Sequence, residues 1–405
     1  MGPKDAAAAT VDRGAAALVE LSHRIHAHPE LSFEEHRAAA WCAGALAAGG
    51  FTVEAPVAGL DTAFVATAGD GPLTVAICCE YDALPEIGHA CGHNVIAAAA
   101  VGAGLALAPL ADELGCTVKV LGTPAEEGGG GKITMLEAGA FDGCNAAMMV
   151  HPWPTELVQM PCLAVAHYDV AYAGKEAHAS AFPEQGRNAA DALTVAQVAI
   201  GLLRQHSRPG DQVHGIVTLG GAAPNIVPAH TRAKYYVRST SVPALEAWDE
   251  RVRHCFEAGA LATGCELEFL PQGPVYSEFA TDGDLARRYR ANAEARGRHF
   301  PDPPEHAVPA STDMANVSLA MPSIHPTLGL DSLPAVNHQA AFTAHCARPV
   351  ADKALLDGAV AMAWTVVDAA LDPAERSRLT AAAYRHPGPA PSAASEGTPR
   401  GKDRA

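Results

Sequence analysis

The stretch LTVAICCEYDALPEIGHACGHNVIAAAAVGAGLAL, residues 73–107, decides the fold, because it reads as a buried strand, a polar turn and a small-residue helix. Residues 73–79 form a short apolar run typical of a strand covered on both faces. Residues 94–107 are apolar at almost every position, which predicts a helix packed in the interior. The turn between them carries acids, cysteines and histidines.

The same order of elements continues along the chain. Further buried strands are predicted at 117–122 and 145–150, and helices at 13–27 and about 33–48. Strand, helix and strand at this spacing predict a mainly parallel sheet covered by helices, an α/β fold. Function in such sheets collects beyond the carboxyl ends of the strands. The polar clusters lie there, after Cys79, after Gly122 and at His151.

The order of predicted elements changes within residues 167–276, where strands and two long helices predict an inserted α+β domain. The helices of this insert are expected at 187–206 and 244–264. The main domain then comprises residues 1–166 and 277–375, with further helices at 284–297 and 349–371. The Pro-, Ser- and Gly-rich tail, 382–405, is predicted to be disordered.

Composition limits the function. Hydrophobic residues make up 49% of the 405 residues and charged residues 18%, as in a globular protein. The net charge of −17 argues against nucleic acid, which needs a basic face. No signal peptide and no run of about 20 apolar residues is visible, which argues against a membrane. For the same reason we expect a cytoplasmic protein, in which the ten scattered cysteines are reduced thiols and disulfides do not form.

The first cluster that could carry chemistry is His89, Cys91 and His93. A thiolate and an imidazole two residues apart can bind one metal ion or straddle a pair, and both suit zinc or a similar ion. The alternative is a buried cysteine between two histidines that cap the turn and the helix. This segment alone leaves both interpretations open.

The second cluster is GTPAEEGGGGK, residues 122–132. Adjacent side chains diverge, so one carboxylate of Glu126 and Glu127 can bind a metal while the other acts as a general base on water. A solvated acidic turn is the alternative. A phosphate-binding loop is excluded because it would need Gly at 126 and Ser or Thr at 133.

Three further histidines are candidates by position. His151 follows a buried strand, where a lone histidine is more often structural than a ligand. A role as a ligand is favoured here because the two preceding strands are followed by the Cys/His and Glu/Glu clusters. Late in the chain, AVNHQAAFTAHC offers His338 and His345.

Six motifs, in order, resemble the metallopeptidases and amidohydrolases related to aminoacylase. The resemblance runs from about residue 13 to 372. Within the family, the chain is most similar to the subgroup of aminobenzoyl-glutamate hydrolases and aminoacylase-like dipeptidases. The motifs are HPELSFEEH (28–36), EYDALPEIGHACGHN (80–94), GTPAEEGGGGK (122–132), MMVHPWP (148–154), GKEAHASAFPEQGRNAADA (174–192) and STDMANVS (311–318).

This resemblance implies a catalytic domain with two divalent metal ions, zinc or manganese, with cobalt or nickel as further options. The implied ligands are Cys91, His93, Glu127, His151 and His338, with His345 as an alternative to His338, and the implied general base is Glu126. His89 falls on a non-ligand position. Aminoacylases proper have His-x-Asp where this chain has Glu80-Tyr81-Asp82, so Glu80 replaces a ligand and Asp82 is expected to orient one.

The insert resembles the family's lid and dimerisation domain. His178 resembles a histidine that reaches into the partner's site and stabilises the oxyanion. Asn225 and Arg238 resemble lid residues that hold the carbonyl or carboxylate of the substrate. The guanidinium of Arg238 matches a carboxylate in two hydrogen bonds, although without the resemblance a surface position on a strand is the simpler interpretation.

The resemblance predicts a metal-dependent amidohydrolase or dipeptidase. Its substrate would be a small molecule, an N-acyl-amino acid or dipeptide with a free carboxylate, and Glu126 would act on a metal-bridging water. A homodimer formed through the lid is expected. The alternatives are a biosynthetic deacylase for a specialised metabolite and a non-catalytic binding scaffold, against which the intact Glu126–Glu127 pair argues.

Overall fold

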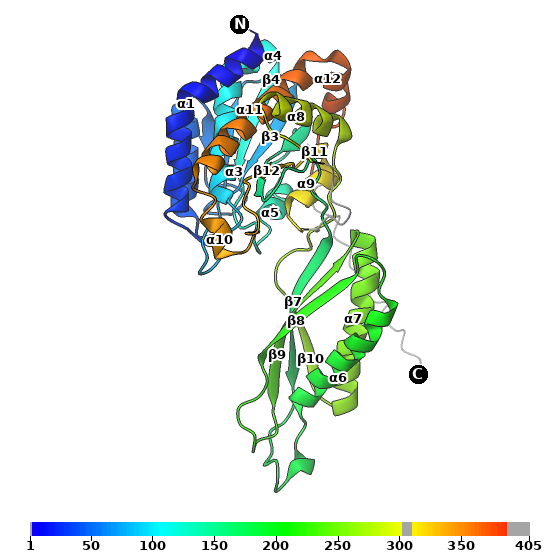
Figure 1. The fold of residues 1–405 in the computed structure, drawn as a ribbon. Coiled ribbons are helices and arrows are strands. Elements are labelled where there is room, and N and C mark those ends of the chain that lie inside the picture. Colours follow the sequence, from blue (N-terminus) through cyan, green and yellow to red (C-terminus); the bar gives the residue numbers. More distant parts are fainter. Residues whose placement is uncertain (1, 302–309, 387–405) are drawn as a thin grey trace, which may run out of the picture.

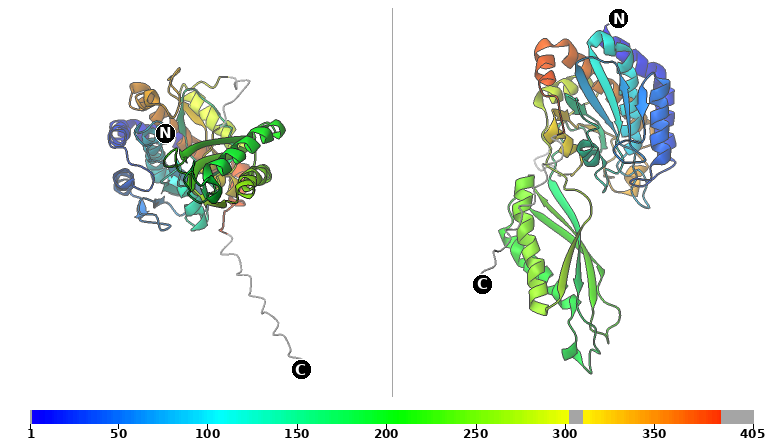
Figure 2. Two further views of the ribbon diagram at one scale, coloured as in Figure 1. Left: turned by 90° about the horizontal axis from the view of Figure 1, so that it is seen from below. Right: turned by 180° about the vertical axis from the view of Figure 1, so that it is seen from behind.

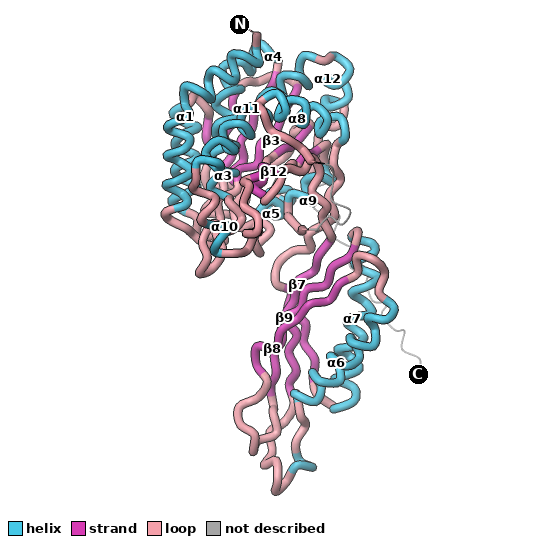
Figure 3. Tube along the Cα trace, in the orientation of Figure 1, coloured by secondary structure: helices cyan, strands magenta, loops and turns pink. Residues whose placement is uncertain are grey.

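The computed structural model describes residues 2–301 and 310–386, which form a larger and a smaller body (Figure 1). The larger body combines the N-terminal and C-terminal parts of the chain. The smaller body protrudes from it as a sheet with two helices on one face (Figures 2 and 3). The predicted disordered tail lies outside the described residues from residue 387 onward.

A six-stranded sheet in the order β1-β2-β4-β3-β5-β11 forms the centre of the larger body. Strands β4, β3, β5 and β11 pair in parallel, and β1 and β2 add an antiparallel edge. The prediction of a mainly parallel sheet covered by helices is confirmed. The strands are β1 (Thr52–Glu54), β2 (Phe64–Ala68), β3 (Leu73–Cys79), β4 (Cys116–Gly122), β5 (Ala146–Met148) and β11 (Ser323–Ile324).

Helices cover both faces of this sheet. Alternate residues of β3 point to opposite faces, and both sets are mostly apolar and buried, so each face needs a covering layer. Val75 and Ile77 belong to the core that α1, α3 and α11 cover, whereas Ala76 and Cys78 pack with residues of α5 and α9. The helices of this body are α1 (Pro3–His26), α2 (His36–Ala48), α3 (His93–Leu107), α4 (Ala111–Leu114), α5 (Gly131–Glu137), α8 (Gly283–Ala295), α9 (Met314–Ala320), α10 (Ala340–Thr343), α11 (Pro349–Leu371) and α12 (Pro373–Thr380).

The central helix α3 lies close to its neighbours because its residues are small. A Cβ atom on Gly104 would come within 2.6 Å of the Val120 side chain in β4. Two segments, His93–Leu114 and Pro349–Leu371, are long and apolar enough to cross a membrane, but 83% and 78% of their apolar windows are buried inside the protein. Burial of this extent is typical of core helices in a folded domain.

The smaller body is an antiparallel sheet in the order β10-β7-β9-β8, with two helices packed on one face. Alternation along β9 buries Ala233, Tyr235 and Val237 under the helices and leaves the residues between them on the open face. The elements are β7 (Ala164–Ala173), α6 (Ala189–Leu203), β8 (Gln212–Leu219), β9 (His230–Ser239), α7 (Val242–Thr263) and β10 (Glu266–Pro271).

Several predicted element boundaries were wrong. The helix predicted at 13–27 is α1, which begins at Pro3, ten residues earlier. Helix α2 begins at His36 because Phe33 has a φ of 66°, which no right-handed helix accommodates. The strand predicted at 145–150 is shorter, and His151 begins a separate strand, β6 (His151–Trp153), which pairs with β12 (Thr327–Gly329). Pro152 lacks the N–H group that a central strand needs, so this segment is found in a two-stranded sheet.

Candidate metal centre

The polar clusters that follow the strands meet at one end of the main sheet, as expected for the carboxyl ends of parallel strands. A cavity of about 520 Å³ opens there, and residues of β9 in the smaller body complete its wall. Six of the residues singled out in the sequence line it: Cys91, Glu126, Glu127, His151, Arg238 and His338. His93 is fully buried beside them.

Three groups of side chains could each hold a metal ion, because the donor atoms within a group lie within 4.8 Å of one another. Cys91, His93 and Glu127 each belong to two groups, so the three groups overlap in space. Sulfur, nitrogen and carboxylate oxygen are donors that zinc and similar ions accept. The groups are Cys91, His93 and His151; Cys91, Glu127 and His338; and His93, Glu126 and Glu127.

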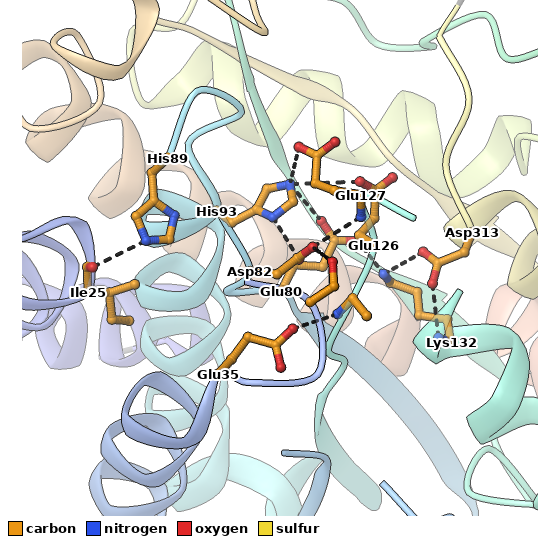
Figure 4. A network of polar contacts seen from close by, with 12 residues as sticks. Ile25, Glu35, Glu80, Asp82, His89, His93, Glu126, Glu127, Lys132 and Asp313 are labelled. Atoms are coloured by element: carbon orange, nitrogen blue, oxygen red, sulfur yellow. Dashed lines mark hydrogen bonds and ion pairs between the residues drawn. The ribbon is translucent and has the colours of Figure 1, made fainter. Parts of the chain in front are cut away.

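His93 is oriented for such a role by Asp82. Its Nδ1 lies 3.0 Å from Asp82 Oδ1, and its Nε2 faces the carboxylates of Glu126 and Glu127, each 3.9 Å away (Figure 4). Nε2 is buried and has no hydrogen-bond partner among the described residues. A buried nitrogen without a partner and facing two carboxylates fits a cation between them.

Asp82 also holds the loop that carries the glutamates. Its Oδ2 accepts a hydrogen bond of 3.0 Å from the backbone N–H of Glu127. Burial alone would raise the pKa of Asp82, but the neighbouring His93 outweighs it and lowers this pKa to about 2. The ionised carboxylate therefore connects the turn after β3 with the turn after β4.

His151 and His338 come from two distant segments of the chain, the start of β6 and the loop before α10. The Nδ1 of His151 donates to the carbonyl oxygen of Pro152 at 2.8 Å, and burial and then His93 lower the pKa of His151 to about 3, so its neutral ring offers Nε2. His338 is more exposed, and its Nε2 lies 3.6 Å from Glu127 Oε2. Its alternative, His345, belongs to none of the ligand groups found among the described residues.

Glu126 is the buried member of the glutamate pair. Burial, followed by the charges of Glu80 and Glu127, raises the pKa of Glu126 well above its usual range. The hydroxyl of Tyr276 donates to its backbone carbonyl at 2.7 Å. A carboxylate whose pKa is raised in this way holds a proton more readily than an exposed glutamate does, as a group that accepts a proton from water requires.

Glu35, in the motif HPELSFEEH, holds the turn that presents Glu126, a role that the sequence alone did not reveal. Its Oε1 accepts hydrogen bonds of 2.9 Å from the backbone N–H groups of Phe33 and Ala125, and its Oε2 accepts one of 2.8 Å from Thr62. Ala125 directly precedes Glu126 and has a φ of 59°. Glu35 thus stabilises a left-handed residue next to the candidate base.

We predict a pH-dependent stability difference between the wild type and Glu35→Gln. Burial, then the charge of Asp82, raises the pKa of Glu35 from 4.5 to about 7. Between these two values the native state binds more protons than the unfolded state, so the wild type loses stability relative to the variant as the pH rises from about 4.5 to about 7. At 1.36 kcal/mol per unit the total is about 3 kcal/mol.

Urea unfolding of the metal-free proteins at several pH values measures this difference. Glu137→Gln, at an exposed position, is the matched control and should show no such trend. A constant difference between wild type and Glu35→Gln over pH 4.5 to 7 would contradict the prediction.

His89, the remaining histidine of the opening turn, points away from the cluster. Its Nε2 donates to the carbonyl oxygen of Ile25 at 3.2 Å, and burial lowers its pKa to about 3. It belongs to none of the ligand groups formed by the described residues. This position agrees with a structural role in connecting the turn to α1.

Arg238 reaches the cavity from β9 of the smaller body. Its Nη1 donates to Ser311 Oγ at 2.5 Å, and Ser311 in turn donates to the carbonyl oxygen of Leu163 at 2.8 Å. Tyr236 lines the same wall. The structure therefore places a guanidinium in the wall of the cavity that the candidate metal ligands also line.

His178 and Asn225 lie elsewhere, in the segments that connect β7 with α6 and β8 with β9. These two connections are at the end of the smaller body that points away from the larger one (Figure 1). The backbone N–H of Ala179 donates to the carbonyl oxygen of Asn225 at 3.0 Å, which places the two residues side by side. His178 is exposed, and its Nδ1 accepts hydrogen bonds from the backbone of Ser180 and Ala181, so Nε2 carries the proton of the neutral ring. Within one chain neither residue lines the cavity.

Sequence reasoning also missed a buried group of charges behind His93. Lys132 is fully buried and forms ion pairs with Glu80 and Asp313. A lysine directly after a glycine run, at the start of a helix, was the only local signal. Its partners could not be identified because Asp313 lies 181 residues away in the sequence.

Comparison with known proteins gives consistent matches. Peptidase family M20/M25/M40 matches residues 76–359. The Xaa-Arg dipeptidase of Mus musculus is 39% identical over 394 residues, covering 92% of this chain and 90% of that protein. A p-aminobenzoyl-glutamate hydrolase chain of Escherichia coli (strain K12) is 33% identical over 270 residues, covering 62% of this chain and 56% of that one.

One solved structure with the same fold comes from Bacillus subtilis and is described as a dinuclear metal binding peptidase from the M20 family. It superposes with a TM-score of 0.61 at 22% identity, covering 86% of this chain and 98% of that chain. This likeness concerns the fold. Together the matches confirm the resemblance that the six sequence motifs indicated.

Proposed function

This chain is an amide-bond hydrolase that belongs to peptidase family M20/M25/M40, and we propose that it cleaves N-acyl-amino acids or dipeptides with a free carboxylate. One observation carries the proposal: Glu126, four of the five candidate metal ligands and Arg238 line the same cavity. A base, a place for cations and a carboxylate-binding group are the parts that such a reaction requires.

We propose that Cys91, His93, Glu127, His151 and His338 hold two divalent ions. Bound ions would supply Lewis acidity and would lower the pKa of the attacking water. The thiolate and imidazole donors favour zinc, cobalt or nickel over magnesium, and manganese is the further candidate. The Bacillus subtilis relative described as dinuclear supports the number of ions.

Glu126 moves the proton in this scheme. Its carboxylate takes a proton from water as the oxygen attacks the amide carbon, and it then passes the proton to the amide nitrogen as the C–N bond breaks. The products are a carboxylate and an amine. Glu35, Asp82 and Tyr276 hold the backbone on either side of Glu126, so the carboxylate stays aimed at the cavity.

Replacing Arg238 by Met should lower kcat/KM about 10–100-fold for substrates with a free carboxylate, because a charge-assisted hydrogen-bond pair is lost. The same substrates with the carboxylate blocked as an amide should react equally poorly with wild type and variant. Arg232→Met, on the same strand and exposed, is the matched control. An equal loss for free and blocked substrates would contradict a role in carboxylate binding.

We further propose a homodimer formed through the smaller body, in which His178 and Asn225 of one chain complete the site of the other. Their position far from the cavity of their own chain supports this. Strand β8 lies at the edge of its sheet and exposes Ile216, Val217 and Leu219. An apolar edge strand of this kind favours pairing with another copy.

Mixing two inactive variants tests the dimer. Glu126→Gln and His178→Ala should each hydrolyse slowly, and heterodimers formed after mild unfolding and refolding together should regain activity, because one of the two sites then has both residues. Size-exclusion chromatography with light scattering gives the mass of the assembly. Activity of the mixture equal to the average of the two variants would exclude sharing of the site.

Substrate profiling would separate the proposed hydrolase from a biosynthetic deacylase. The panel would contain dipeptides ending in Arg, suggested by the name of the mouse relative, dipeptides ending in Ala, and N-acyl-amino acids. Among the described residues that line the cavity, Glu126 and Glu127 are the acids. A strong preference for Arg would therefore require an acidic group from outside this wall.

We also propose that the protein works in the cytoplasm. All ten cysteines are free thiols and nine are buried, including Cys91. A reducing compartment would keep Cys91 available as a ligand. Cell fractionation would test the location directly.

A further inference from the structure

A buried ion-pair network lies directly behind the candidate metal ligands. The side chains of Lys132, Glu80 and Asp313 are all fully inaccessible to solvent. Lys132 Nζ lies 2.7 Å from Asp313 Oδ1 and also forms an ion pair with Glu80 (Figure 4). The backbone N–H of Lys132 donates to Asp313 Oδ2 at 2.9 Å, so Asp313 is tethered at two points.

Glu80 is the member of this network that faces the metal centre. Its Oε2 lies 3.7 Å from His93 Nε2, closer than the 3.9 Å that separate this nitrogen from Glu126 and from Glu127. Glu80 Oε2 has no hydrogen-bond donor among the described residues. A carboxylate at this distance from a ligand nitrogen could bind the same ion.

The ion pair with Lys132 explains why Glu80 does not have to bind the ion held by His93. A fully buried carboxylate needs a cation, and removing the cation from a buried pair is strongly destabilising. Glu80 and Asp313 share the ammonium of Lys132, whereas Glu126, Glu127 and Cys91 line the open cavity. The acids thus divide into a pair that shares the one ammonium of Lys132 and a set that lines the cavity, where it is left for bound cations.

We propose that Lys132 is a positioning residue of the metal centre, whose ammonium holds Glu80 back and so keeps this carboxylate from becoming an additional ligand of the ion on His93. The inference rests on the proposed two-metal function. It extends that function, because one buried lysine would then limit how many oxygen ligands the metal ion has. Fewer oxygen ligands keep the site suited to zinc-like ions.

Two double variants with equal net charge test this. Lys132→Met/Asp313→Asn leaves the Glu80 carboxylate without its cation, and Lys132→Met/Glu80→Gln leaves Asp313 instead. Each variant retains the net charge of the wild type and leaves one carboxylate unpaired, so folding cost and long-range electrostatics are matched. They differ in whether the remaining carboxylate faces His93.

We expect Lys132→Met/Asp313→Asn to bind Mn²⁺ about tenfold or more tightly than Lys132→Met/Glu80→Gln in chelator competition. With Co²⁺ as the probe, its visible absorption should weaken, because an added ligand raises the coordination number. Equal affinities and equal Co²⁺ spectra for the two variants would overturn the role of Lys132.

A single variant avoids the loss of the lysine. Glu80→Gln can still accept from Lys132, and we expect it to retain two metal ions per chain. Loss of an ion from Glu80→Gln would show that Glu80 is already a ligand and would overturn the inference. A wild type that binds no metal ion would instead refute the proposed two-metal function itself.

Discussion

Replacing Glu126 by Gln should lower kcat by about 10²–10⁴-fold while the protein keeps its metal ions. Gln has the shape of Glu but cannot take a proton from water. The backbone contacts that hold residue 126, from Tyr276 and through the neighbouring Ala125 and Glu127, do not involve the replaced carboxylate. Steady-state kinetics together with metal analysis of the purified variant measure both quantities.

Glu127→Gln is the matched comparison for this prediction. Both residues lie in the same turn, but Glu127 belongs to two of the ligand groups and lies 3.6 Å from His338. Its replacement should lower the metal content, and excess metal should partly restore turnover. A Glu126→Gln variant with near-normal turnover would refute the assignment of Glu126 as the base.

Replacing Cys91 by Ala should remove metal and activity together. Cys91 also belongs to two ligand groups, so its loss weakens both candidate positions. The loss of affinity should exceed the roughly 10–100-fold that changes outside the ligand set typically cause. Burial, then Glu127, raises the pKa of the Cys91 thiol, so metal binding must release its proton and should tighten as the pH rises.

Cys78→Ala provides the control for this experiment. Cys78 is also buried, packs in the core with residues of α5 and α9, and belongs to none of the ligand groups among the described residues. It should retain two ions per chain. Unchanged metal content and pH dependence in Cys91→Ala would remove Cys91 from the proposed ligand set.

The sequence predicted the framework of the site because the relevant signals are local. Strand β3, the polar turn and α3 follow one another within 35 residues, and each has its own pattern of apolar residues. The Glu126–Glu127 pair likewise follows its strand directly. Motifs of this length carry their structural context with them, so the family could be inferred from six of them in order.

Contacts between distant segments could not be inferred in this way. Glu35 holds the N–H of Ala125 across 90 residues, and Lys132 pairs with Asp313 across 181. The backbone N–H of His338 donates to the carbonyl oxygen of Ala90, and its side chain lies beside Glu127. Each of these depends on the packing of elements, which local patterns do not specify.

The sequence by itself thus determined the α/β fold, the family and the chemical types at the site, because periodicity and short motifs fix local structure and side-chain chemistry. The tertiary structure alone decided which carboxylates face the cavity, which are paired with Lys132, and that His178 and Asn225 do not line the cavity of their own chain. The physical reason is that burial and charge balance depend on neighbours in space.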